Sequence, residues 1–376
     1  MRIALIVPGG VDRSGEYRVV PALLALIERL SAHHDVHVFA MHQEPRPATW
    51  TLLGAVIHNI GAGDTRVRAL QGILREHRSS AFDLVHGVWG GMSGFVAVLS
   101  ARLIGRPSLV HLAGGELVSL PALGYGGRRR WVGRIQESLV LRGATMLTAA
   151  SSPMIESVRH AGFVAERVPL GVDVRVWPVA EPRRRDTTEF ASLIHVASLN
   201  RVKDQPCLLR AMAYLAEWDV GFELDVIGED TLHGEVQGLA RELGISSRVR
   251  FHGFLTQRQL LPLVRAAHVM IISSRHEAGP LAMLEAAVQG VPTVGTAVGH
   301  IAEWAPEGAV AVSQGDPEAL AHAVRELLQS EDCRLRIARE AQRRAIKESA
   351  DYTATRFEAL YEKLARERLD GVRPGC

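Results

Sequence analysis

Two glutamates eight positions apart, Glu277 and Glu285, have types and spacing that could bind a ligand. A buried strand is predicted to end before Glu277, and a helix carrying Glu285 is predicted to begin near Pro280. The start of a helix offers unpaired backbone N–H groups and a positive dipole end, which suit a diphosphate. Carboxylates accept hydrogen bonds from hydroxyl groups, so the pair indicates a ligand with phosphate between two polyols. A salt-bridged helix glutamate and a solvated loop glutamate are the alternative interpretation.

Short apolar runs alternate with amphipathic segments along the whole chain, which favours an α/β fold of parallel sheets wrapped by helices. The strands expected in the first half are Ile3–Val7, Val36–Phe39, Leu84–Val85, Leu109–Leu112 and Met146–Thr148. Those expected in the second half are Leu193–Val196, Leu224–Ile227, Val249–Phe251, Val269–Ile272 and Thr293–Val294.

The alternation pauses between Asp173 and Glu189, where proline and charged residues predominate, as in a linker. We therefore expect two doubly wound Rossmann-like domains that face each other across a cleft. The predicted domains are residues 1–180 and 181–350. Residues 351–376 are predicted to form a helix that crosses back onto the first domain.

Motifs in the second half carry a family resemblance. They are Ser198-Leu-Asn-Arg-Val-Lys203-Asp, Asp225-Val-Ile-Gly228-Glu, Phe251-His-Gly253-Phe, Glu277-Ala-Gly-Pro-Leu-Ala-Met-Leu-Glu285, Gly290-Val-Pro292 and Gly299-His-Ile-Ala-Glu303. In this order they resemble glycosyltransferase family four (glycosyl transferases group one), the retaining group within the GT-B fold. The resemblance implies a hexosyltransferase-like enzyme that takes a nucleotide-diphosphate sugar as donor and needs neither a metal nor another cofactor.

The resemblance also implies roles for individual residues. Glu277 would contact the donor sugar, Glu285 the ribose hydroxyls, and Lys203 the leaving diphosphate, whose charge a fixed cation can stabilise. The backbone from Gly279 through Pro280 to Leu281 would bind the phosphates. Gly253 and Arg201 complete the expected donor site.

One position departs from the family pattern. Five residues before Lys203, where the family commonly has an arginine, this chain has Ser198. Arg201 is the nearest candidate to replace that charge, although a different backbone position delivers its guanidinium differently.

The first half offers loops and histidines for the acceptor. Gly9, Gly10 and Gly15 follow the first strand, and their spacing lacks the GxGxxG pattern of dinucleotide binding. The family commonly has a histidine where this chain has Ala113. His111, two positions earlier on the same strand face, is the catalytic candidate, and His86 at another strand end is the second. A purely structural role is the alternative for both.

Composition excludes several classes of protein. A net charge of +2 on 376 residues argues against general nucleic-acid binding. No segment reaches the roughly 18 apolar residues of a membrane span, and the N-terminal run does not resemble a signal peptide, so a cytoplasmic location is expected. Three separated cysteines suggest neither disulfides nor a metal site. The segment Arg128–Arg134 indicates either peripheral contact with the inner membrane face or a solvated basic helix.

Two other functions remain open at this point. A nucleotide-sugar epimerase on the same architecture would need no separate acceptor. A noncatalytic sugar-nucleotide-binding partner of an active transferase is compatible with Ser198 and Ala113.

Overall fold

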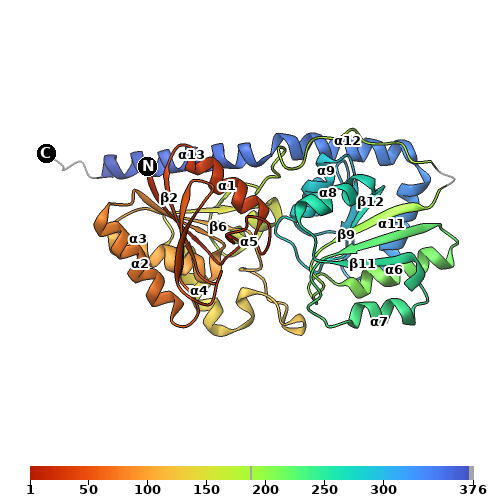
Figure 1. Ribbon diagram of the computed structural model, residues 1–376, viewed down its shortest axis with the longest axis horizontal. Coiled ribbons are helices and arrows are strands. Elements are labelled where there is room, and N and C mark those ends of the chain that lie inside the picture. The colour runs from red at the N-terminus through yellow and green to blue at the C-terminus, as the bar shows by residue number, and fades with distance from the viewer. Residues whose placement is uncertain (187–188, 372–376) are drawn as a thin grey trace. The chain divides into compact units, whose positions relative to one another are not determined.

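The computed structural model describes residues 1–186 and 189–371, which form two α/β units (Figure 1). The first unit comprises Met1–Asp173 together with the chain from Ala350 onward, and the second comprises Val174–Ser349. The first boundary therefore falls after Asp173 rather than after residue 180. The last helix belongs to the first unit by its contacts.

The first unit is built on an eight-stranded sheet of order β3-β4-β2-β1-β5-β6-β7-β8. The strands are β1 Arg2–Val7, β2 Asp35–Ala40, β3 Ala48–Leu52, β4 Ala55–Asn59, β5 Leu84–Val88, β6 Ser108–Leu112, β7 Met146–Ala149 and β8 Glu166–Arg167. Only the edge strand β3 pairs antiparallel, with β4. The β3–β4 hairpin was absent from the strands predicted from the sequence.

Helices cover both faces of this sheet. They are α1 Pro21–Ser31, α2 Thr65–Ser79, α3 Phe95–Ile104, α4 Trp131–Gly143, α5 Ser152–His160 and α13 Ala350–Gly371, with the single turns η1 Gly90–Gly94, η2 Pro121–Leu123 and η3 Gly127–Arg129. Helices α1 and α13 pack together on one face, and α2, α3 and α4 pack side by side on the other (Figure 1). The central strands β1, β5 and β6 are buried along almost their whole length because helices cover both faces of the sheet.

The second unit has a six-stranded parallel sheet of order β11-β10-β9-β12-β13-β14. Its strands are β9 Ala191–Val196, β10 Phe222–Ile227, β11 Val249–Gly253, β12 Val269–Ile272, β13 Thr293–Thr296 and β14 Val310–Val312. Its helices are α6 Gln205–Glu217, α7 Glu235–Glu242, α8 Gln257–Ala266, α9 Leu281–Val288, α10 Gly299–Trp304, α11 Pro317–Gln329 and α12 Glu331–Lys347, with the turn η4 Ser246–Arg248. This strand order is that of doubly wound nucleotide-binding sheets, whose ligands lie where the order reverses.

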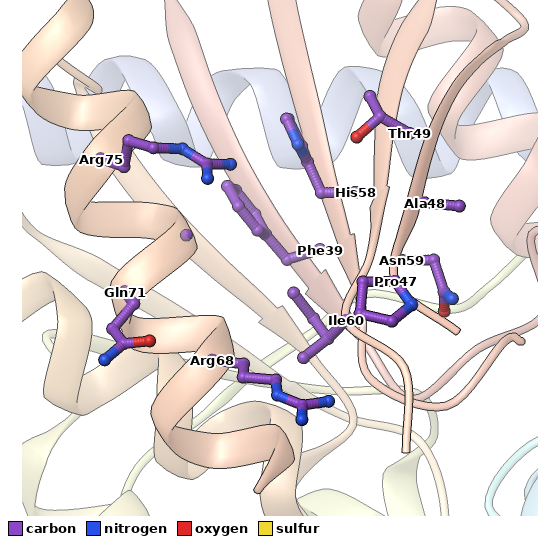
Figure 2. Close-up of a pocket in the computed structure, with 11 residues that line it drawn as sticks. Phe39, Pro47, Ala48, Thr49, His58, Asn59, Ile60, Arg68, Gln71 and Arg75 are labelled. Carbon is purple, nitrogen blue, oxygen red and sulfur yellow. The ribbon is translucent and has the colours of Figure 1, made fainter. Parts of the chain in front are cut away.

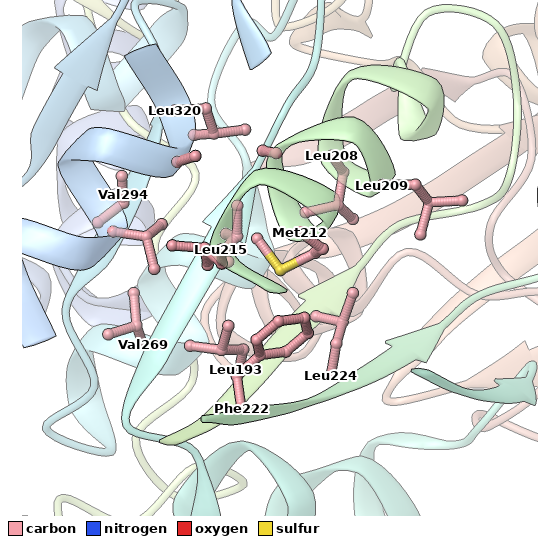
Figure 3. Packing of buried hydrophobic residues seen from close by; sticks show 14 of the residues in the cluster. Leu193, Leu208, Leu209, Met212, Leu215, Phe222, Leu224, Val269, Val294 and Leu320 are labelled. Carbon is pink, nitrogen blue, oxygen red and sulfur yellow. The ribbon is translucent and has the colours of Figure 1, made fainter. Parts of the chain in front are cut away.

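A buried apolar cluster holds the second unit together. Figure 3 shows Met212 of α6 packed over Leu193, Phe222 and Leu224 of the sheet, with Leu320 of α11 alongside. All five side chains are fully buried. This core fixes the strands β9 and β12, between which the strand order reverses.

Candidate functional site

An ion pair bridges the point where the strand order of the second unit reverses. Lys203 follows β9, Glu277 follows β12, and the Lys203 Nζ donates to Glu277 Oε1 at 2.6 Å. Ser274 Oγ donates to the same oxygen at 2.7 Å. The structure thus brings together two of the three residues predicted to be catalytic.

Hydrogen bonds between the two loops fix this geometry. Ser273 Oγ donates to the carbonyl oxygen of Lys203 at 2.8 Å, and the backbone N–H of Arg275 donates to the carbonyl oxygen of Val202 at 2.7 Å. The side chains of Lys203 and Glu277 are 24% and 12% exposed. A ligand can therefore reach a charge pair whose positions are set in advance.

Glu285 lies on α9 and is 7% exposed. Gln257 Nε2 donates to its Oε1 at 3.2 Å. Burial raises the pKa of the Glu285 carboxyl to about 7, and the hydrogen bond from Gln257 opposes that rise. A carboxyl poised near neutral pH in a nearly dry position is typical of a binding site.

The loop before α9 allows a very close backbone approach. Helix α9 starts at Leu281, with Pro280 as its N-cap. A Cβ added to Gly279 would lie 2.7 Å from the His300 Nε2, so only glycine fits there without displacing that ring. His300 is itself 1% exposed and lies 3.1 Å from Glu303. The backbone of Gly279 through Leu281 is therefore placed at the start of a helix, as predicted.

Gly253 lies at the same edge of the sheet. Its carbonyl oxygen accepts from the backbone N–H of Gly228 at 2.9 Å, and its φ is +69°. Gly253 thus joins the loops that follow β10 and β11.

Arg201 does not join the Lys203–Glu277 pair. Its guanidinium lies 3.5 Å from Glu235 of α7, and both side chains are exposed. The suggestion that Arg201 replaces the missing arginine at Ser198 therefore finds no support. The loop after β12 carries another cation, Arg275, whose Nε donates to Asp204, the N-cap of α6.

Sequence reasoning missed three residues that shape this site: Ser274, Gln257 and His300. Ser274 lies three positions before Glu277, so a local hydrogen bond could have been considered. Gln257 lies on α8 and gave no local signal, and His300 was part of the motif Gly299-His-Ile-Ala-Glu303 but was assigned no role of its own.

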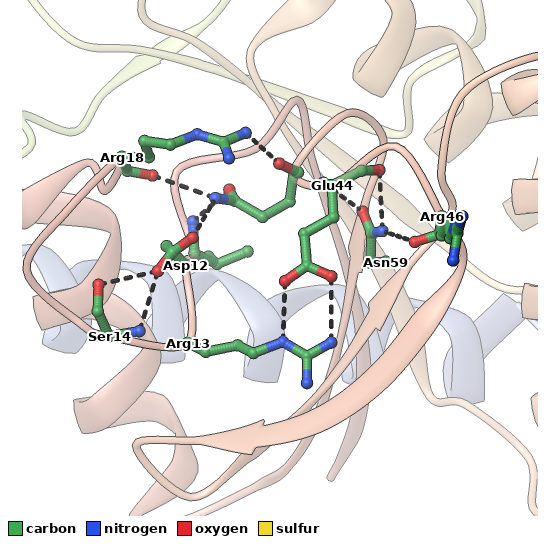
Figure 4. A network of polar contacts seen from close by, with 9 residues as sticks. Asp12, Arg13, Ser14, Arg18, Glu44, Arg46 and Asn59 are labelled. Carbon is green, nitrogen blue, oxygen red and sulfur yellow. Dashed lines mark hydrogen bonds and ion pairs between the residues drawn. The ribbon is translucent and has the colours of Figure 1, made fainter.

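In the first unit, the loop of Gly9, Gly10 and Gly15 is braced by a polar network (Figure 4). Gln43 Oε1 accepts from the backbone N–H groups of Gly10 at 2.7 Å and Val11 at 2.9 Å. Gly10 has φ +84°, and a Cβ there would meet Val20 at 2.7 Å. Gly15 has open space around it. Gly10 therefore serves a tight turn.

His86 and His111 are core residues, which corrects the catalytic role expected for them. Both are fully buried, and both rings pack against Phe357 of α13. His86 hydrogen-bonds Tyr361 at 2.7 Å and His111 hydrogen-bonds Thr148 at 3.0 Å. Burial lowers the pKa of His111 to about 3, so it stays neutral. The sequence missed this because the covering helix comes from the far end of the chain.

A cavity of about 290 Å³ lies at the carboxyl ends of β1, β5 and β6, where the strand order of the first sheet reverses. Its lining includes Pro8, Met41, Trp89, Met92, Gly114 and Glu116. Trp89 has φ 66° and ψ 135°, a conformation that normally only glycine adopts. Backbone strain of this kind is often retained at functional sites.

Two carboxyl groups support this cavity. Glu116 accepts from the backbone N–H groups of Gly90, Ala113 and Gly114 at 2.9, 3.3 and 2.8 Å. Glu137 of α4 is 1% exposed, and burial together with the charge of Glu116 raises its pKa to about 8. Burial thus favours the protonated form of Glu137 near neutral pH.

Among the described residues, one group of potential metal ligands gathers, namely His37, His58 and Glu76, whose ligand atoms lie within 4.8 Å of one another. Arg2 Nη2 hydrogen-bonds His37 at 3.0 Å and lies 3.7 Å from Glu76. This guanidinium charge disfavours a bound cation. His58 also borders a separate cavity of about 450 Å³ beside α2, with Arg68 and Arg75 at its rim (Figure 2).

Two family models together match most of the chain. The model of glycosyl transferases group 1 matches residues 182–344, and the model of the glycosyl transferase 4-like domain matches residues 19–171. Two Rossmann-like units with these matches define a glycosyltransferase of the GT-B fold. The chain belongs to the group 1 glycosyltransferases.

Named relatives agree with this assignment. The glycogen synthase of Mycobacterium tuberculosis is 28% identical over 322 residues, which cover 82% of this chain and 75% of the relative. The structure of sucrose-phosphate synthase from Thermosynechococcus elongatus superimposes with a TM-score of 0.83 at 18% identity, covering 97% and 99% of the two chains. That of Anabaena HepE in complex with UDP-glucose gives 0.74 at 17% identity, covering 98% and 100%. The predictions of an enzyme and of the GT-B fold are confirmed.

Proposed function

We propose that this glycosyltransferase moves a sugar from a nucleotide-diphosphate sugar to an acceptor, with retention of anomeric configuration and without a metal. The observation that carries the proposal is the Lys203–Glu277 pair at the reversal of the second sheet. Glu277 lies on the loop that leads to α9, where backbone N–H groups favour phosphate.

Lys203 would stabilise the leaving diphosphate. Breakage of the bond between the sugar and the phosphate leaves negative charge on a phosphate oxygen, which a preorganised ammonium group stabilises. An ammonium group has three donors, so Lys203 can bind phosphate while it retains Glu277. Glu277 would in turn accept a hydrogen bond from a hydroxyl of the donor sugar.

Glu285 would hold the ribose. Two ribose hydroxyls can donate to its two carboxylate oxygens, and such hydrogen bonds favour the ionised form. Because the pKa of free Glu285 is raised to about 7, donor binding near neutral pH would release a proton. Proton release on binding is a direct test of this role.

The acceptor would bind at the first unit, in the cavity beside Trp89. His86 and His111, the two histidines that the sequence offered as a base, are fully buried, so neither can take the proton of the acceptor. The acceptor oxygen would instead attack from the side of the leaving phosphate, whose oxygen takes the proton. One sugar–phosphate bond breaks and one sugar–oxygen bond forms on the same face, which retains the configuration.

The first experiment is a thermal-shift screen of the purified protein against nucleotide-diphosphate sugars, with a chelator present throughout. UDP-glucose leads the panel because it is bound in the HepE structure. A ligand that binds the folded state must raise its melting temperature. We expect stabilisation by at least one donor, and NMR of the product should show the anomeric configuration of that donor.

Other outcomes have definite meanings. A strict requirement for a divalent metal, or an inverted product, would refute the corresponding part of the proposal. A new nucleotide sugar formed without any acceptor would identify an epimerase instead.

A further inference from the structure

Helix α4 presents an unusual row of apolar side chains to solvent. Trp131, Val132, Ile135 and Leu139 are 67%, 48%, 52% and 51% exposed. Residues four apart lie on the same side of a helix, so Trp131, Ile135 and Leu139 form one stripe. The opposite side of α4 buries Glu137, Val140 and Leu141 in the first unit. The first unit therefore leaves about half or more of each side chain in the stripe uncovered.

The segment that carries this stripe is rich in positive charge. Between Gly126 and Ala144 the chain has five arginines, which are Arg128, Arg129, Arg130, Arg134 and Arg142. The single acidic residue of that segment is Glu137, which is 1% exposed and has its pKa raised to about 8. The whole chain, in contrast, balances 43 basic against 41 acidic residues. The face is thus both apolar and strongly cationic.

We propose that the surface formed by residues 126–143, the α4 face, docks on an anionic lipid bilayer. Trp131, Ile135 and Leu139 would enter the boundary between headgroups and acyl chains, and the arginines would bind lipid phosphates. Tryptophan and arginine suit this depth because each joins an apolar body to a polar end. Contact is peripheral, since no helix among the described residues is long and apolar enough to cross a membrane.

The combination of side chains favours a bilayer over other anionic partners. A nucleic acid would use the arginines but would leave the apolar stripe in water. On the helical wheel, Arg142 falls between Trp131 and Ile135, and Arg134 flanks the stripe on the side of Trp131, so charge and apolar surface meet the partner together. This inference does not depend on the donor site, which lies in the second unit.

Vesicle flotation of the full chain tests the proposal. We expect binding to vesicles of phosphatidylcholine mixed with phosphatidylglycerol, weak binding to phosphatidylcholine alone, and loss of binding as salt rises. The triple variant Trp131→Ser, Ile135→Ser, Leu139→Ser should bind at least about tenfold more weakly. Its control is Leu103→Ser with Val164→Ser, two exposed apolar residues of the first unit outside α4, which should bind as the wild type does.

A charge series has its own control. Arg129→Gln, Arg130→Gln and Arg134→Gln together should lower affinity for anionic vesicles about a hundredfold, since each basic residue contributes about fivefold. The same loss of charge at Arg210, Arg258 and Arg339, exposed residues of the second unit, should change affinity little. Melting temperatures report whether each variant remains folded.

Three results would overturn the inference. The first is equal binding of the wild type to both kinds of vesicle, and the second is undiminished binding by the serine variant. The third is a dimer in light scattering that the serine substitutions dissociate, without vesicle binding, which would identify a second copy as the partner. In every case donor binding in the thermal-shift assay should be unchanged, so failure here is distinct from failure of the proposed transfer reaction.

Discussion

The two sheets reverse their strand order in the same way, yet the chemistry at the two reversals differs. Between β9 and β12 a lysine holds a carboxylate, and the partly exposed pair carries charges of both signs. Between β1 and β5 a cavity is supported by Glu116, bound by three backbone N–H groups, and by the protonated Glu137. The fold fixes where a ligand can bind, and local side chains decide which ligand. We propose the donor diphosphate for the reversal in the second sheet and the acceptor for the reversal in the first.

The largest effect on activity should follow removal of Lys203, the cation at the point between β9 and β12 where the strand order of the second sheet reverses. Lys203→Ala is expected to lower kcat/KM about a thousandfold, in the range seen when one preorganised donor to developing negative charge is removed. It also leaves Glu277 with only Ser274 as a described side-chain donor. Initial rates over a series of donor concentrations will measure the loss.

Arg201→Ala is the matched control for Lys203→Ala. Arg201 lies two residues away but pairs with Glu235 on the surface, so its removal should change kcat/KM less than about threefold. Equal losses in the two variants would show that proximity in sequence, and not the Lys203–Glu277 contact, governs activity.

Changes at Glu285 and Glu137, the buried carboxyls of the two units, should have similar effects on the pH dependence of stability and different effects on donor binding. Glu285 has a pKa raised from 4.5 to about 7, and Glu137 has one raised to about 8. Between pH 4.5 and these values the unfolded chain releases protons that the folded chain retains, so stability falls as pH rises. For Glu285 the loss is complete above pH 7 and is on the order of 3 kcal/mol.

Glu285→Gln and Glu137→Gln remove that loss, because glutamine does not ionise. The melting temperature of each variant minus that of the wild type should therefore be more positive at pH 8 than at pH 5. Only Glu285→Gln should weaken donor binding, by about tenfold, through loss of a charged acceptor for ribose hydroxyls. Calorimetry with the best donor will distinguish them, and weaker donor binding by Glu137→Gln would contradict the comparison.

Features that depend on neighbouring residues were predicted more successfully than contacts between segments that are far apart in the sequence. The succession of strands along the chain and the position of Glu277 just before α9 follow from apolar runs, and the place of Lys203 in the same site followed from a family motif. His86 and His111 were misplaced because their burial depends on Phe357 and Tyr361, which no local pattern links to them. Trp89, at φ 66° just before the turn Gly90–Gly94, was also missed, because a residue other than glycine gives no sequence signal for this conformation.

A smaller effect is expected from crowding the phosphate loop. Gly279→Ala places a methyl group 2.7 Å from the His300 Nε2, so the loop or the ring must shift. Donor affinity should fall about tenfold, the cost of roughly 1.4 kcal/mol. Gly238→Ala on α7 is the control, because its nearest neighbour would be 3.9 Å away and alanine favours a helix. If both variants bind the donor equally well, the backbone of Gly279 is not part of the site.

The smallest effect is expected from relieving the backbone strain at Trp89, beside the point between β1 and β5 where the strand order of the first sheet reverses. Trp89 has φ 66° and ψ 135°. The variant Trp89→Gly should therefore be more stable than Trp89→Ala by about 1 kcal/mol, because glycine adopts this conformation without strain. Trp131 begins the helix α4, so there the order should reverse, with alanine about 1 kcal/mol more stable than glycine. Melting curves of the four variants measure both differences.

Both Trp89 variants should raise KM for the acceptor equally, by about tenfold if the indole stacks on a sugar ring, and leave donor affinity unchanged. An unchanged acceptor KM together with the expected stability order would show strain at Trp89 that serves the fold alone.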